Sequence, residues 1–152
     1  LFQGRHGEAL REGQHAQSLE PTSFAYASNV GMIRYFLRDY DTAIAQLAIH
    51  YCDALAEDPG ARAAYFPGFD FAASPSVAFS PAGRAIVLDA LVGRMMAQNV
   101  ATEPGAAEVR AEIDNLITRL SACGGSCPPG RTGTIVKASC AALLGSAVTL
   151  VH

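Results

Sequence analysis

Cysteine and histidine are the residue types through which this chain could bind a metal or carry out redox chemistry. The 152-residue sequence contains four of each, and two of the cysteines form the motif Cys123-Gly-Gly-Ser-Cys127. A glycine-rich loop of this length can close into a small disulfide ring. The spacing differs from the CxxC redox motif, and neither a second cysteine pair nor a histidine supports zinc. For Cys123 and Cys127 we therefore rank a disulfide first, free thiols second and a metal site third.

The other two cysteines, Cys52 and Cys140, lie within apolar helical patterns. Because free cysteine is among the most buried residue types, we expect both to behave as small buried hydrophobic side chains. No paired carboxylate motif, glycine-rich phosphate loop or Ser/His/Asp set is evident in the sequence. We therefore expect a protein that is not an enzyme.

An apolar corner follows one of the helical patterns. Asp58 suits an N-cap, and Pro59 suits the first helical position, where no backbone N–H is needed. The sequence Tyr65-Phe66-Pro67-Gly68-Phe69-Asp70-Phe71 then places four aromatic residues in seven positions. A loop this apolar must cover either a core or an apolar ligand.

Helical periodicity dominates the chain, and no segment alternates with period two. This predicts an all-α fold with about five main helices and one or two short turns. Residues 66–80 are expected to form a loop, and the glycines and prolines of 123–130 break the chain before a last, central helix. The expected helix starts are Ser23 or Ser28, Asp41, Ser80, the residues before Pro104, and Thr132 or Thr134.

Composition limits the domain organisation and the partners. Residues 1–4 match the core of a protease site used to remove tags, and residues 5–21 are polar, so we expect 1–21 to be a scar and a flexible lead-in. Residues 22–152 are expected to form a single helical domain. The net charge of −3 with 11 basic residues does not favour nucleic-acid binding, and the apolar stretch 138–151 is too short for a membrane span. We expect a soluble, cytoplasmic protein.

The segment from Tyr51 to Phe71 resembles the globin superfamily, in which a helix, a proline-led turn and an aromatic corner packed on haem follow one another. Tyr51, eight residues before Pro59, matches the distal tyrosine of bacterial globins. Residues 28–51 resemble the first two globin helices, residues 83–96 the distal helix and residues 136–151 the penultimate helix. The resemblance covers roughly three quarters of the chain.

The resemblance implies a globin-like bundle with an apolar ligand pocket. Gly83 stands at the position of the distal histidine, and Val87 stands at the valine position that faces the ligand. The pocket residues that it implies are Tyr51, Phe66, Phe69, Gly83, Val87 and Leu116.

The chain departs from the globin pattern where iron would be held. A haem globin needs a proximal histidine, and residues 111–127, which should supply it, contain none. Cys123 is the first residue of that segment with a thiol that can ligate haem iron, and it is a remote candidate. We therefore expect no cofactor and no metal. The histidines of the chain are His6, His15, His50 and His152.

Three functions follow from these observations. The first is a non-enzymatic, globin-like sensing or interaction module that binds a protein partner, a second copy of itself or an apolar small molecule. The second is a haem-binding globin that binds a diatomic gas such as oxygen, with Tyr51 as the distal residue. The third is a Bcl-2-like helical interaction protein, although residues 91–94, Leu-Val-Gly-Arg, match its Asn-Trp-Gly-Arg signature only in part.

Overall fold

The computed structural model describes residues 6–20, 23–36, 40–96 and 105–146. Within these ranges the chain is helical and contains no strand, which confirms the all-α class. The helices are α1 (His6–Leu19), α2 (Phe24–Phe36), α3 (Tyr40–Glu57), α4 (Pro59–Tyr65), α5 (Pro75–Ala78), α6 (Pro81–Met95), α7 (Ala106–Ser121) and α8 (Arg131–Leu144).

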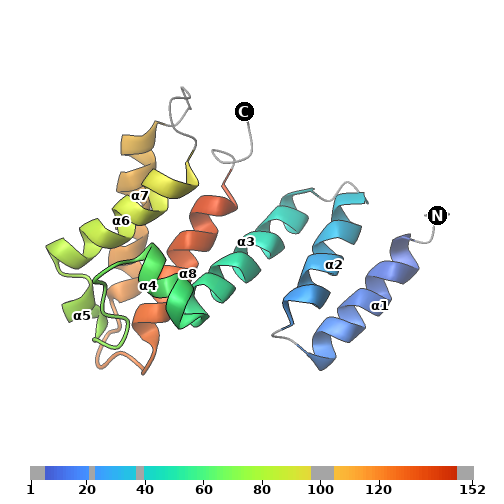
Figure 1. Ribbon diagram of the computed structural model, residues 1–152, viewed down its shortest axis with the longest axis horizontal. Coiled ribbons are helices and arrows are strands. Elements are labelled where there is room, and N and C mark those ends of the chain that lie inside the picture. Colours follow the sequence, from blue (N-terminus) through green and yellow to red (C-terminus); the bar gives the residue numbers. More distant parts are fainter. Residues whose placement is uncertain (1–5, 21–22, 37–39, 97–104, 147–152) are drawn as a thin grey trace.

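Helices α1, α2 and α3 lie side by side in chain order, and α3 packs with its other side on α8 (Figure 1). Helix α8 also contacts α5, α6 and α7, which makes it the central helix of the C-terminal part. This agrees with the expectation that the last helix is central. Helix α3 therefore links the first two helices to the rest of the molecule.

The main hydrophobic core lies among α3 to α8, and we refer to it as the core cluster. Its largest fully buried side chains are Phe66, Leu91, Ile117, Ile135 and Leu143. None of the described side chains of α1 and α2 belongs to it. These two helices instead pack through small residues: a Cβ at Gly13 would lie 3.1 Å from a methyl group of Val30.

Three of the expected helix starts are formed as predicted. Helix α2 begins at Phe24, directly after Ser23. The Asp58 carboxylate accepts a hydrogen bond of 2.6 Å from the Ala61 N–H, and Pro59 is the first residue of α4. Helix α6 begins at Pro81, directly after Ser80. The predicted start before Pro104 lies outside the described residues. Helix α7 begins after Gly105, whose N–H donates to the Glu108 carboxylate at 3.1 Å.

Four boundaries differ from those expected. Helix α3 begins at Tyr40, one residue before the expected start at Asp41. The lead-in contains α1 over His6–Leu19, because the absence of a side chain at Gly13 lets this otherwise polar helix approach α2. The predicted scar at residues 1–4 lies outside the described residues. The loop of residues 66–80 contains the short helix α5. Helix α8 begins at Arg131, because Gly130 adopts a φ of 75°, a left-handed conformation that favours glycine, immediately before it.

Candidate functional site

The aromatic corner after α4 is folded over the core. Phe66 and Phe69 are buried and belong to the core cluster, and Phe71 packs against it. The Phe69 ring meets the Phe71 ring edge-on, with centroids 4.9 Å apart, and lies 5.4 Å from the Phe79 ring. Such contacts hold aromatic rings in fixed relative positions. The corner thus fills the core with its own side chains.

Gly83 marks the place where α6 begins against α5. A Cβ at this position would collide with the carbonyl oxygen of Ala78 and would lie 3.6 Å from the Phe69 ring. No larger residue fits at this position unless α5 shifts. The close approach of two backbones therefore explains why a glycine stands where the globin resemblance would place a histidine.

The six predicted pocket residues do not come together in either of two hollows in the described part of the chain, of which one is lined by Phe66 and Phe69 and the other by none of the six. Val87 is fully buried in the core cluster with Phe66 and Phe69, and Leu116 is half-buried on α7. The prediction that Tyr51 faces the interior is wrong, because its side chain is 47% exposed.

The orientation of α3 explains the position of Tyr51. The helix turns a row of small residues, Ala48, Cys52 and Ala56, inward, and all three are buried. Cys52 in this row bonds to Cys140 of α8, which fixes the direction of the row. Successive residues of an α-helix point about 100° apart, so Tyr51 lies beside the row and not in it.

A hollow of about 300 Å³ does lie at the aromatic corner. The Arg62 guanidinium carbon stands there 4.8 Å from the centre of the Phe71 ring, within the range of a cation–π contact. Neither Tyr51, Val87 nor Leu116 lines this hollow. Its lining residues are Pro59, Arg62, Ala63, Phe66, Gly68, Phe69, Asp70, Phe71 and Ala72.

All four cysteines are paired in disulfides. Cys123 and Cys127 are bonded within the loop between α7 and α8, with Cα atoms 5.3 Å apart. Cys52 and Cys140, each 1% exposed, are buried as expected. The expectation that these two are free thiols is wrong, because the packing of α3 on α8 brings their Cα atoms to 5.8 Å, within disulfide range.

An ion-pair cluster reinforces the same helix pair. The ammonium of Lys137 on α8 lies 2.6 Å from the carboxylate of Asp53 and also pairs with Glu57, both on α3. Burial lowers the pKa of Lys137, but the hydrogen bonds and negative charges of Asp53 and Glu57 outweigh it, so the pKa is raised overall. A disulfide and an ion pair thus hold α3 on α8.

One face of α3 carries apolar side chains that reach solvent, and we refer to Tyr40, Ile44, Leu47 and Tyr51 as the α3 stripe. Their spacing of four, three and four residues places them on one side of the helix. Tyr40, Leu47 and Tyr51 are 43%, 39% and 47% exposed, and Ile44 is half-buried. None of the four is charged. Leu47 borders α2, since a Cβ at Gly31 would lie 3.1 Å from its Cγ.

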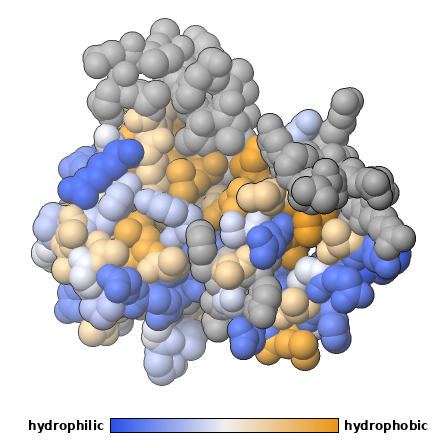
Figure 2. Space-filling model, turned by 45° about the vertical axis from the view of Figure 1, so that its right-hand side comes forward, coloured by the Kyte–Doolittle hydropathy of each residue, from blue (hydrophilic) through white to orange (hydrophobic). Residues whose placement is uncertain are grey.

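The surface near the α3 stripe is continuous with α4. The pKa of Tyr65 on α4 is raised by burial and by its neighbour Tyr51, against the opposing effect of Arg94, whose guanidinium carbon lies 4.9 Å from the centre of the Tyr65 ring. Apolar residues also reach the surface elsewhere, among polar ones (Figure 2). The other exposed large apolar side chains are Leu19, Met32, Ile49 and Val77.

Comparison with known protein families, with curated proteins and with solved structures finds no match for this chain. In the described ranges no helix is long and apolar enough to cross a membrane. The same part of the chain has no cluster of three or more histidine, cysteine, aspartate or glutamate residues placed to hold a metal ion. The candidate sites are therefore the α3 stripe and the disulfide loop.

Proposed function

We propose that this chain is a non-enzymatic interaction module that binds protein through the α3 stripe and holds no histidine-ligated haem. The single observation that carries the proposal is the stripe itself. Helix α3 is packed by α2 on one side and by α8 on another, and it still presents Tyr40, Leu47 and Tyr51 to solvent. Exposed apolar surface that is grouped on one face is typical of protein interfaces.

The residue types of the stripe support a protein partner. Tyrosine is enriched at interfaces because its ring supplies apolar contact area while its hydroxyl stays hydrated or finds a partner. The centres of interfaces are depleted in charged residues, and the α3 stripe has none. Two acidic residues of α3, Asp53 and Glu57, lie on another side, where they pair with Lys137.

A second copy of the chain is the partner that this surface fits best. In a symmetric dimer the same patch meets itself, so a charge near the two-fold axis would face its own copy. An uncharged stripe avoids this repulsion. We therefore propose an isologous dimer in which the α3 stripes of two copies face each other.

The proposal that the protein holds no histidine-ligated haem rests on the positions of the histidines in the sequence. No histidine lies between Tyr51 and Val151. His50 on α3 is engaged with Gln17 of α1, at 3.3 Å between their side-chain nitrogens. The order of α3, α4, aromatic corner and α6 supports a globin-like frame without an iron ligand. The central position of α8 equally supports a Bcl-2-like frame, and both frames are compatible with an interaction module.

Sedimentation velocity over a concentration series tests the proposal. We expect the parent to pass from monomer to dimer, and we expect Leu47→Gln/Tyr51→Gln to weaken the dimer by roughly tenfold or more, the effect of losing well-packed interface side chains. Val77→Gln is the matched control, because Val77 is 65% exposed on α5, outside the stripe. A parent that stays monomeric, or a control that weakens the dimer equally, would contradict the proposal.

A further inference from the structure

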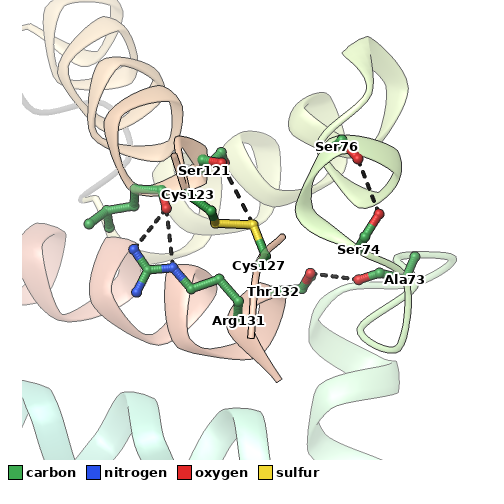
Figure 3. The surroundings of a disulfide bond; sticks show 9 residues. Ala73, Ser74, Ser76, Ser121, Cys123, Cys127, Arg131 and Thr132 are labelled. Atoms are coloured by element: carbon green, nitrogen blue, oxygen red, sulfur yellow. Dashed lines mark hydrogen bonds between the residues drawn. A yellow bond between two sulfur atoms is a disulfide. The ribbon is translucent and has the colours of Figure 1, made fainter. Parts of the chain in front are cut away.

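The disulfide loop between α7 and α8 opens on a hollow of about 510 Å³. Cys123 and Cys127 are both partly exposed and both line this hollow, opposite the segment that leads into α5 (Figure 3). A small thiol or an extended peptide can therefore reach the sulfur atoms. The remaining polar residues that line the hollow are Ser74, Ser76, Ser121, Ser126, Arg131 and Thr132.

Hydrogen bonds besides the disulfide hold the start of α8 to α7 and to the segment before α5 (Figure 3). The guanidinium of Arg131 donates two hydrogen bonds to the carbonyl oxygen of Leu120, at 3.2 and 2.8 Å. The buried hydroxyl of Thr132 donates to the carbonyl oxygen of Ala73 at 2.6 Å. Cys123 and Cys127 are only four positions apart in the sequence. The ring that their bond closes is therefore small, and it restricts the unfolded chain little. Opening this bond should therefore leave the fold intact.

The electrostatic environment of the loop favours a thiolate. Arg131 is the only charged residue among the described residues that line the hollow. Helix α8 also begins at Arg131, and the start of a helix carries a partial positive charge. A nearby cation and a helix N-terminus both stabilise the thiolate form of cysteine, which is the form that leaves and attacks in disulfide exchange.

From these observations we infer that the Cys123–Cys127 disulfide is a thiol–disulfide exchange site that accepts electrons from thiol reductants. A reductant thiolate attacks one of the two sulfurs, forms a mixed disulfide and displaces the other cysteine as a thiolate. A second reductant thiol attacks the mixed disulfide. The products are two cysteine thiols on this chain and one disulfide on the reductant, so two electrons and two protons are transferred.

The second disulfide provides an internal reference. Cys52 and Cys140 are each 1% exposed between α3 and α8, so a reductant cannot reach them in the folded protein. The exchange chemistry is thus confined to the loop. The inference is independent of the α3 stripe, because no residue of the stripe lines this hollow.

The test is native-state reduction followed by alkylation and peptide mass spectrometry. With dithiothreitol as the probe, we expect Cys123 and Cys127 to be alkylated while Cys52 and Cys140 remain bonded and the circular dichroism spectrum stays unchanged. Reduced glutathione is the second probe. A glutathione adduct on Cys123 or Cys127 indicates that the site accepts monothiols. Two free thiols without an adduct indicate that it accepts dithiols. Either product supports the exchange site.

Charge variants separate a chemical role of Arg131 from a structural one. We expect Arg131→Gln to slow exchange by roughly threefold to tenfold and Arg131→Lys to stay near the parent rate, since a shift of one pKa unit changes the thiolate population up to tenfold. Reduction of Cys52–Cys140 at the same rate as the loop would overturn the inference. The inference would also be overturned if Cys123 and Cys127 reacted with the reductant only in denaturant.

Discussion

Cys52 on α3 and Cys140 on α8 are joined by a disulfide across 88 residues of sequence, in the most buried part of the contact between these helices. The bond closes a long loop, and disulfides that close long loops stabilise most in the chain-entropy description. It is also the covalent tie between α3, on which α2 packs, and the central helix of the core cluster.

Removal of this disulfide should destabilise the protein strongly. We expect Cys52→Ala/Cys140→Ala to lower the free energy of unfolding by about 2–5 kcal/mol. The matched control is Cys123→Ala/Cys127→Ala, which removes the bond between cysteines that are four positions apart and should cost less than about 2 kcal/mol. Urea denaturation of the three proteins measures both values. Equal losses in the two variants would show that loop length does not govern stability here.

The hydrogen bond from Thr132 to Ala73 ties α8 to the corner loop. Thr132→Val keeps the shape of the side chain but leaves the Ala73 carbonyl without this donor, and we expect a loss of about 1–3 kcal/mol. Thr134→Val is the control, because Thr134 is exposed and bonds only to Gly130 within its own turn. If urea denaturation gives the same free energy of unfolding for both variants, the buried hydrogen bond contributes no more to stability than the exposed one.

The raised pKa of Lys137 predicts that the protein loses stability at high pH. The pKa of the lysine is raised in the folded state, so its ion pairs stabilise the fold fully below the unfolded pKa of about 10.4 and lose this effect as the pH rises through the folded value. Between about pH 9.5 and 11.5 the Tm of the parent should therefore fall more than that of Lys137→Met. The pKa of Tyr65 is also raised and acts in the same window, so Tyr65→Phe, which removes that titration, is measured in parallel. Parallel curves for the parent and Lys137→Met would contradict a role for the lysine.

The core cluster should depend on Leu91. This side chain is fully buried on α6, and Leu91→Ala should cost about 2–5 kcal/mol through lost burial and the cavity that remains. Val77→Ala removes an exposed aliphatic side chain and should change the Tm by little. A Tm of Leu91→Ala within a degree of the parent value would mean that packing of α6 in the core cluster does not stabilise the protein.

Hemin titration tests the haem-free proposal. Because no histidine follows Tyr51 before His152 and Tyr51 is exposed, we expect no saturable one-to-one binding with a histidine-type Soret spectrum. Tyr51→Phe should give the same titration as the parent. Tight binding in the parent that is lost in Cys123→Ser would instead identify a thiolate ligand.

Local signals in the sequence predicted much of the helical framework. Pro59 and Pro81 set the starts of α4 and α6, and the Asp58 carboxylate caps α4, since each acts on its immediate neighbours. The glycines and prolines of residues 123–130 also act on their immediate neighbours, so the end of α7 and the short disulfide could be predicted from them. Helix α1 was missed because its residues are mostly polar and its contact with α2 depends on the space at Gly13, which periodicity does not register.

The position of Tyr51 could not be predicted from spacing. Tyr51 and Cys52 are adjacent on α3, and both belong to apolar periodic patterns, so the pattern alone does not tell which side of the helix meets the core. The choice is made by α8, whose Cys140 bonds to Cys52 and whose Lys137 pairs with Asp53. The α3 stripe is therefore a side of the helix that α8 leaves uncovered, and it borders α2 at Leu47.

The Cys52–Cys140 bond also changes what a cut in the backbone would do. The chain from Cys52 to Cys140 is a closed covalent circle that contains all of α4, α5, α6 and α7. A protease that cleaves one peptide bond inside this circle leaves a single nicked molecule, whose fragments separate only after reduction. A cut before Cys52, between α2 and α3, leaves the first two helices attached to the rest of the protein only by non-covalent contacts.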